Sequence, residues 1–136
     1  MDKIYSRCQP DTLLHLVFRK AEMAAGRIDL IPAEQFLQCS ALNLKQGQTF
    51  QAHQHVWKAG PGQVIAQESW VVIAGEVRCL FFDLDGQYLE DCRLLPGDAS
   101  FTLQGGHNYE ALVPDTLVYE YKTGPYTGQQ QDKVFI

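Results

Sequence analysis

The stretch from Gly47 to Gly75 reads GQTFQAHQHVWKAGPGQVIAQESWVVIAG, and this stretch decides which fold the chain can adopt. Two histidines, His53 and His55, are two positions apart in a run in which apolar and polar residues alternate. In a β-strand, residues i and i+2 lie on the same face, about 6.6–6.8 Å apart along the strand axis. Both imidazoles are therefore expected to point into one interior. Glu68 opens the next strand-like run and is expected to face the same interior.

A third histidine, His107, follows a Gly-Gly pair further along the chain. Three imidazoles and one carboxylate that converge in a β interior make a site for a divalent transition metal. The sequence thus predicts one metal ion, with Fe, Zn, Ni or Mn as candidates, bound by His53, His55, Glu68 and His107. A carboxylate ligand favours Fe or Mn over a purely structural Zn. In the alternative interpretation, the two paired histidines are polar side chains on a solvated strand face.

The spacing of these residues resembles the sequence motifs of the cupins. The first motif is present as Gly47, five residues, His53-x-His55, a gap, Glu68, six residues and Gly75. The run Gly105-Gly106-His107 resembles the core of the second motif. The resemblance covers roughly residues 40–123 and implies that the three histidines and the glutamate are the metal ligands.

The chain also departs from the cupin pattern. Twelve residues separate His55 from Glu68, where the family has a much shorter gap. In the second motif, Thr102 stands at the expected proline, Gln104 at the expected glycine and Ala111 at the expected asparagine. Taken whole, the chain is similar to the small single-domain cupins of the WbuC-like sort, which are found with O-antigen and other surface-polysaccharide genes.

Short strand-like runs separated by turn residues predict an all-β sandwich or barrel. The cupin resemblance narrows this prediction to a double-stranded β-helix, a jelly-roll-like barrel. Residues 11–25 read DTLLHLVFRKAEMAA and place Leu13, Leu14, Val17, Phe18 and Ala21 at helical spacing, which predicts an N-terminal amphipathic α-helix. We expect one domain over residues 1–136, with the helical segment at 11–25, the barrel at roughly 36–123 and a tail at 124–136.

The composition is that of an ordinary globular protein, with 46% apolar and 20% charged residues in a chain of 136. A net charge of −5 argues against nucleic acid and against anionic membranes as partners. No apolar run approaches the length of a membrane span, and Met1–Arg7 is too polar for a signal region. The four cysteines form no C-x-x-C pair and are expected to be free thiols. The protein is therefore expected to be cytoplasmic.

Residues near the predicted ligands are candidates for contacts with a small-molecule substrate. Three tyrosines could act as acid or base, or could simply pack in the barrel: Tyr109, Tyr119 and Tyr121. Five side chains could line the substrate site: Gln51, Trp57, Lys58, Gln67 and Trp70. Core packing is the alternative for Trp70, and a solvated surface position is the alternative for Lys58.

Two functions from different classes are consistent with the sequence. The first is a metal-dependent enzyme that acts on a small polar molecule, such as a sugar or sugar nucleotide, as an isomerase or epimerase. The sugar comes only from the cupin resemblance, and an iron-dependent dioxygenase is a variant of this hypothesis. The second is a non-catalytic module that binds a metal or a small ligand.

Two further expectations concern the assembly and the site's surroundings. The closing run Val134-Phe135-Ile136 and the apolar run Val77–Phe82 predict a homodimer, because one small barrel leaves such surface uncovered. The excursion over residues 56–67, with Gly60-Pro61-Gly62 at its tip, is expected to form a wall or lid of the ligand pocket. The alternative for the excursion is a plain extension of two paired strands.

Overall fold

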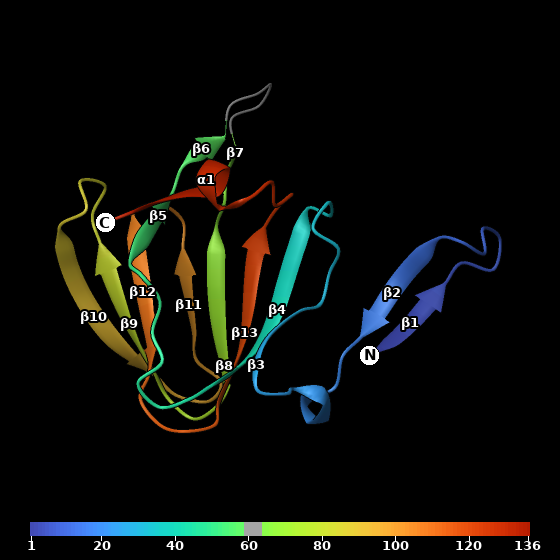
Figure 1. Ribbon diagram of the computed structural model, residues 1–136, viewed down its shortest axis with the longest axis horizontal. Coiled ribbons are helices and arrows are strands. Elements are labelled where there is room, and N and C mark those ends of the chain that lie inside the picture. Colours follow the sequence, from blue (N-terminus) through green and yellow to red (C-terminus); the bar gives the residue numbers. More distant parts are fainter. Residues whose placement is uncertain (59–63) are drawn as a thin grey trace.

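The computed structural model of the chain describes residues 1–58 and 64–136 (Figure 1). These residues form fourteen β-strands, a 3-10 helix and a short α-helix. In chain order they are β1 (Asp2–Tyr5), β2 (Leu13–Val17), η1 (Lys20–Glu22), β3 (Gly26–Asp29), β4 (Leu37–Leu44), β5 (His53–His55), β6 (Trp57–Lys58), β7 (Val64–Ile65), β8 (Glu68–Ala74), β9 (Val77–Phe82), β10 (Tyr88–Leu94), β11 (Ala99–Thr102), β12 (Gly106–Ala111), β13 (Thr116–Thr123), α1 (Gln129–Asp132) and β14 (Lys133–Phe135).

Ten of the strands form two five-stranded antiparallel sheets that share one core (Figure 1). The strand order is β10-β9-β12-β5-β14 in the first sheet and β11-β8-β13-β4-β3 in the second. Sequence neighbours are often not sheet neighbours: β12 pairs with both β5 and β9, and β13 pairs with both β4 and β8. The arrangement confirms the all-β prediction.

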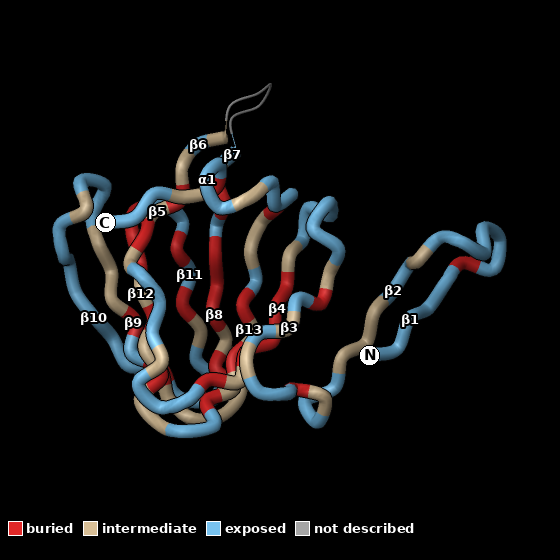
Figure 2. The backbone as a smooth tube through the Cα atoms, in the orientation of Figure 1, coloured by how far each residue is buried: buried red, intermediate tan, exposed pale blue. Residues whose placement is uncertain are grey.

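The interior of this barrel is apolar at one end and polar at the other. The strand β8 runs from the polar end to the apolar end and is buried over much of its length (Figure 2). Its alternate residues Glu68, Trp70 and Val72 lie on one face, with Glu68 at the polar end and Trp70 and Val72 in the apolar cluster. The apolar end takes side chains from both sheets: Leu42, Leu44, Trp70, Val72, Val77, Cys79, Leu94, Tyr109, Ala111 and Val118. Burial of these side chains removes apolar surface from water and stabilises the strands that carry the polar end.

Gly75 makes the turn between β8 and β9 possible. Its φ of +79° lies in the left-handed region, and a Cβ at this position would lie 2.7 Å from the Cα of Thr116. The cupin-like glycine therefore has a steric reason, since the turn packs directly against the start of β13.

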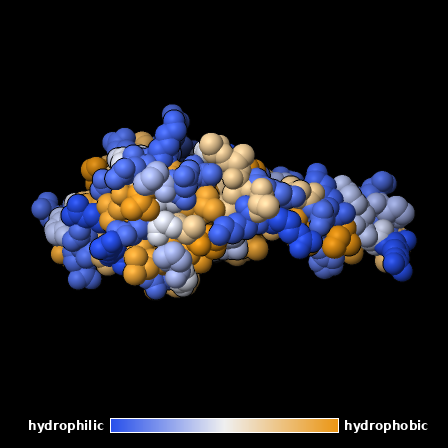
Figure 3. All heavy atoms as spheres, turned by 90° about the horizontal axis from the view of Figure 1, so that it is seen from below, coloured by the Kyte–Doolittle hydropathy of each residue, from blue (hydrophilic) through white to orange (hydrophobic). Residues whose placement is uncertain are grey.

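The predicted N-terminal helix is wrong. Residues 13–17 form β2, which pairs with β1, and only a 3-10 turn, η1, follows before the next strand. A short apolar run fits the helical and the strand period almost equally well, and here a pairing partner upstream decides the outcome. Gly26, the residue directly after the predicted helical segment, opens β3. The hairpin β1–β2 projects from the barrel as a narrow arm (Figures 1 and 3).

The predicted tail carries ordered structure that docks on the barrel. After α1, the strand β14 pairs with β5 at the edge of the first sheet. Ile136 packs beside Gly106, where a Cβ would lie 2.5 Å from the Cδ1 atom of Ile136. Gly106, noted in the sequence for its position before His107, thus also leaves room for the end of the chain.

The excursion between His55 and Glu68 begins and ends as a short hairpin, β6 paired with β7. Its expected tip, Gly60-Pro61-Gly62, lies outside the described residues. In the part of the chain that the structure describes, no helix has the length and apolar character needed to cross a membrane.

Candidate metal centre

Three strands bring the four predicted ligands together at the polar end of the barrel. His53 and His55 come from β5, Glu68 from β8 and His107 from β12. Strand register accounts for much of the convergence, because His107 lies directly opposite His53 in the β12–β5 pair. One ligand atom from each residue can be chosen so that all four lie within 4.8 Å of one another, and all four residues are buried.

Hydrogen bonds turn the histidines so that their Nε2 atoms face the centre. His53 Nδ1 lies 3.0 Å from the carbonyl oxygen of Gln51, which fixes this nitrogen as the donor. His55 Nδ1 lies 3.2 Å from Asp132 Oδ2 and 3.3 Å from the Asp132 carbonyl oxygen. His53 Nε2 then carries a free lone pair, and His55 Nε2 gains one when a metal displaces its proton.

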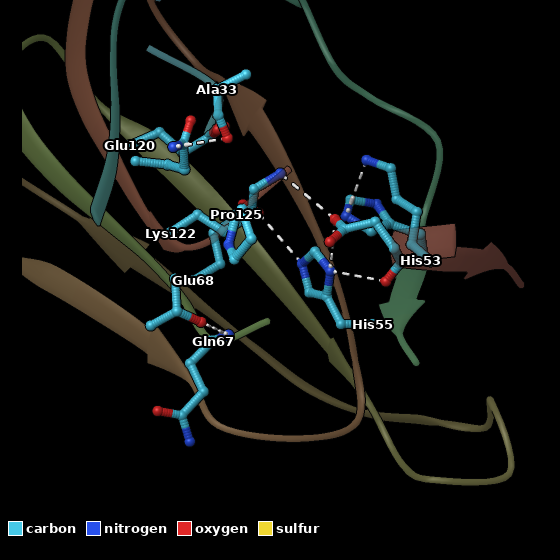
Figure 4. A network of polar contacts seen from close by, with 12 residues as sticks. Ala33, His53, His55, Gln67, Glu68, Glu120, Lys122 and Pro125 are labelled. Carbon is cyan, nitrogen blue, oxygen red and sulfur yellow. Dashed lines mark hydrogen bonds and ion pairs between the residues drawn. The ribbon is translucent and has the colours of Figure 1, made fainter. Parts of the chain in front are cut away.

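Glu68 contacts the imidazole of His55, which is labelled with it in Figure 4, and the imidazole of His107. Its Oε2 is 3.3 Å from His55 Nε2 and its Oε1 is 3.3 Å from His107 Nε2. Trp70 Nε1 donates to Oε1 at 3.1 Å and holds the carboxylate in this orientation. The indole therefore does more than fill the core, because it positions a predicted metal ligand.

Burial and neighbouring charges set the protonation of these groups in opposite directions. Burial lowers the pKa of His53 to about 4, so its imidazole is neutral at pH 7. Burial also acts against a charged His55, but the carboxylates of Asp132 and Glu68 outweigh it and raise the pKa of His55 to about 9. Burial opposes the ionisation of Glu68, yet contacts with His107 and His55 hold its pKa well below the ordinary value.

These residues fit a divalent metal ion. His107 is completely buried, and neither of its ring nitrogens makes a well-aligned hydrogen bond within residues 1–58 and 64–136, although Nε2 lies 3.3 Å from Glu68 Oε1. A buried nitrogen without a partner is costly, and a metal on its Nε2 atom would satisfy it. An ionised carboxylate and imidazoles whose Nε2 atoms face one centre are the donor set that transition metals take. The group could therefore hold a metal ion.

A cavity of about 530 Å³ opens beside His53 and Glu68. Two cross-strand rows of the second sheet supply one wall: Glu68–Lys122–Gln38 and Trp70–Glu120–Ser40–Asp29. Side chains in register on adjacent strands lie on the same face, so both rows face the interior. The opposite wall comes from Gln51, His53, Asn108, Lys133 and Phe135.

An ion-pair network occupies the far side of this cavity. Arg27 donates to both carboxylate oxygens of Glu120, at 3.0 and 2.7 Å, and to Asp29 at 2.8 Å. Ser40 accepts from the same guanidinium at 2.6 Å and donates to Asp29 at 2.7 Å. Every charged group of the network is paired, so it shapes the wall as a rigid polar surface.

Comparison with known proteins identifies the fold. No family model and no curated protein sequence matches the chain. Among solved structures, the chain is similar to an uncharacterized conserved protein with a double-stranded β-helix domain from Klebsiella pneumoniae, at 16% identity and a TM-score of 0.62, over 90% of this chain and 97% of that one. The chain has the cupin fold.

Two further cupin-type neighbours are named proteins. KdgF from Halomonas sp. is 24% identical with a TM-score of 0.54, over 71% of this chain and 77% of that one. The capsular polysaccharide assembling protein CapF from Staphylococcus aureus is 18% identical with a TM-score of 0.63, over 81% of this chain. The match spans only 31% of CapF. Identities this low establish the cupin barrel and leave the activity open.

The cupin barrel places three predicted substrate-site residues at the cavity: Gln51, Trp70 and Tyr109. Tyr109 stacks on Trp70 with ring centroids 4.1 Å apart, and its hydroxyl lies 3.1 Å from Ser100 Oγ. Burial raises the pKa of Tyr109 far above its ordinary value, so the phenol stays protonated. It can donate a hydrogen bond and does not serve as a base at neutral pH.

The other predicted substrate-site residues do not reach the cavity. Tyr119 and Tyr121 lie on the outer face of β13, because the alternating residues Glu120 and Lys122 face inward. Tyr119 packs in an outer apolar cluster, and Tyr121 borders a shallow outer hollow together with Gln67. The indole of Trp57, in β6, is exposed. Lys58 turns to Asp132, with Nζ 3.0 Å from Oδ1.

Sequence reasoning missed the residues that the C-terminal segment contributes. Asp132 is completely buried and contacts His55, Lys58 and Lys122. Lys133 reaches the centre from the next position, with Nζ 3.3 Å from His53 Nε2. No periodic pattern marks these two residues, because a four-residue helix and a three-residue strand are too short to show one. The sequence could have indicated that Glu120 lies on the opposite face of its strand from Tyr119 and Tyr121, because it stands between these two tyrosines.

Proposed function

We propose that this chain is a metal-dependent cupin enzyme that acts on a small polar molecule such as a sugar or sugar nucleotide. The reaction would be an isomerisation or epimerisation in surface-polysaccharide synthesis, in line with the WbuC-like sequence resemblance. One observation supports the proposal most: a buried group of three histidines and one glutamate borders a polar cavity. The cavity volume of about 530 Å³ lies within the range of small-ligand sites.

The metal would be held by Nε2 of the histidines and the carboxylate of Glu68, and when bound it would polarise a substrate oxygen. The chain's own groups supply orientation. Asp132 and the Gln51 carbonyl fix the histidine tautomers, and Trp70 fixes Glu68. Tyr109, protonated at neutral pH, is the proposed hydrogen-bond donor to a substrate oxygen, and Gln51 is a hydrogen-bonding wall.

A second candidate is an iron-dependent dioxygenase. The observation that favours it is the ligand set itself, since three histidines and one glutamate also resemble the ligands of that cupin group. The third possibility is a module that binds metal or ligand without catalysis. It differs from both enzymes in that it binds these partners and forms no product. All four cysteines are free, in keeping with the proposed cytoplasmic location.

Elemental analysis of the purified protein tests the metal. We expect about one divalent metal per chain in the parent, and none after the double substitution His53→Ala/His55→Ala. His15→Ala is the matched control, because His15 lies in β2 of the arm, away from the centre, and this variant should retain the metal. A double variant that keeps stoichiometric metal would remove the basis of the proposal.

A turnover screen then tests the reaction. Protein with and without its metal is incubated with sugars and sugar nucleotides, and products are followed by NMR. Metal-dependent conversion between isomers supports the proposal, and oxygen consumption with an iron-containing sample supports the dioxygenase instead. Equal conversion by the chelated and the metal-bound protein would contradict both.

A further inference from the structure

Lys133 lies next to the predicted metal ligands with its charge uncompensated. The strand β14 pairs Lys133 with His55, which sends the lysine side chain to the inner face of the sheet. Its Nζ atom lies 3.3 Å from His53 Nε2 and lines the cavity. Within residues 1–58 and 64–136, no carboxylate oxygen lies within 4.0 Å of this ammonium group.

The other cations of the cavity region are already paired. Arg27 is bonded to Glu120 and Asp29, and Lys58 and Lys122 contact Asp132 at 3.0 and 3.4 Å. Among the cations near the cavity in the described residues, Lys133 is therefore the one that lacks an anionic partner.

Glu68 cannot take this role within the observed arrangement. Its Oε1 faces Trp70 Nε1 and His107 Nε2, and its Oε2 faces His55 Nε2. Turned toward these three groups, the carboxylate lies more than 4.0 Å from the ammonium group of Lys133 and does not pair with it. The one acceptor that Lys133 has is His53 Nε2, which is the same atom that a metal ion would use.

We propose that Lys133 and the metal centre together form a subsite for an anionic group of the substrate, a carboxylate or a phosphate. The inference rests on the metal site of the proposed function and specifies which substrates that site selects. With His53 Nε2 bound to a metal, the ammonium loses its acceptor and lies beside a second cation. An anionic oxygen between the two offsets both charges and accepts a hydrogen bond from Nζ.

The remaining walls fit the uncharged part of such a ligand. Gln51 and Asn108 offer amide donors and acceptors, and the Phe135 ring offers an apolar face. The carboxylates on the far side are taken up by Arg27, so they neither repel the anion strongly nor bind a cationic ligand. The cavity therefore favours a small polar molecule that carries its negative charge at the Lys133 end.

Calorimetric titration of the metal-bound protein tests this subsite. The probes are D-glucose, D-glucuronate and D-glucose 6-phosphate, which share a ring and differ in the group at its sixth carbon. We expect the parent to bind at least one charged probe about tenfold or more tightly than D-glucose. The charged probe that binds identifies the anion as a carboxylate or a phosphate.

Lys133→Met keeps the alkyl stem and removes the charge. We expect it to weaken binding of the charged probe by about ten- to a hundredfold, to leave D-glucose binding unchanged and to keep the metal. Lys133→Arg should recover most of the affinity, and Lys45→Met, at an exposed turn, is the control with the same change in net charge.

The results separate this inference from the proposed function. The subsite is overturned if the Lys133→Met variant prefers the charged probe over D-glucose by the same factor as the parent. It is also overturned if the parent binds the charged probes no more tightly than D-glucose. Absence of metal in the parent overturns the proposed function first. If Lys133→Met weakens binding of the charged probe by the same factor with and without the metal, then Lys133 binds the anion alone. This result would overturn the proposal that the lysine and the metal bind it together.

Discussion

The two ends of this chain are both short strand-bearing segments, but they differ in what they contact. The N-terminal hairpin pairs only with itself and projects away from the barrel (Figures 1 and 2). The C-terminal segment pairs with β5, the strand that carries His53 and His55. The first is exposed along most of its length, whereas the second contains the completely buried Asp132.

This difference shows that the partner of a strand matters more than its length. β1 has four residues and β14 only three, yet β14 delivers Lys133 to the centre and follows directly after Asp132. The hairpin satisfies its own backbone hydrogen bonds, and exposed ion pairs such as Arg19–Asp2 contribute little. The C-terminal segment satisfies buried polar groups of the barrel, whose loss is costly.

Removal of residues 129–136 should have the largest effect. It exposes the edge of β5 and deletes the carboxylate that contacts His55, Lys58 and Lys122. Breaking such a buried pair costs about 3–5 kcal/mol, so we expect a clear fall in Tm and loss of tight metal binding. Thermal unfolding and metal titration of the truncated protein measure this, and parent-like values would show that the segment only rests on the barrel.

Asp132→Asn isolates the carboxylate from the rest of the segment. The strand pairing should survive, but the neutral amide holds His55 in the ligating tautomer less strongly than the charged carboxylate of Asp132 does. We expect metal affinity to fall by about 10- to 100-fold, as for other partners of metal-bound histidines. Asp2→Asn, the matched change in the arm, should leave the affinity unchanged. Equal metal affinities for the two variants would contradict the positioning role of Asp132.

Deletion of residues 1–16 should have a small effect. The ion pairs that it removes, Met1–Glu22 and Arg19–Asp2, are exposed or half-exposed and together contribute about 1 kcal/mol or less. Phe18, whose ring packs edge-on to Tyr119, is retained in this variant. Metal content should stay the same. Loss of metal would show that the arm supports the metal centre. Sedimentation of the parent and the variant measures their oligomeric state and so tests the predicted homodimer.

Thiol labelling compares the same regions without changing the chain. Cys8 in the arm and Cys92 in β10 are exposed, whereas Cys39 and Cys79 are buried in the barrel. Burial raises the pKa of Cys39 to about 11 and that of Cys79 to about 12, so neither forms thiolate at pH 8. We expect two thiols to react quickly and two slowly. Rapid reaction of all four would mean that the barrel opens readily.

The sequence by itself determined the barrel and the group of candidate ligands. The i, i+2 spacing of His53 and His55 fixes a shared face in any strand, and the glycines mark turns that only a few backbone conformations allow. The same local logic failed at residues 11–25. There the run fits two periods, and pairing with β1 across the turn at residues 6–12 decides between helix and strand.

Only the tertiary structure decided which other residues surround the candidate ligands. Asp132 and Lys133 reach the histidines because β14 pairs with β5, whose residues lie almost eighty positions earlier in the chain. Arg27 and Glu120 meet because β3, β4 and β13 are neighbours in one sheet. Contacts of this kind depend on strand order and register between distant segments, and those are set by the closure of the whole barrel. A local pattern shows which face a side chain takes, but not which side chain it will meet.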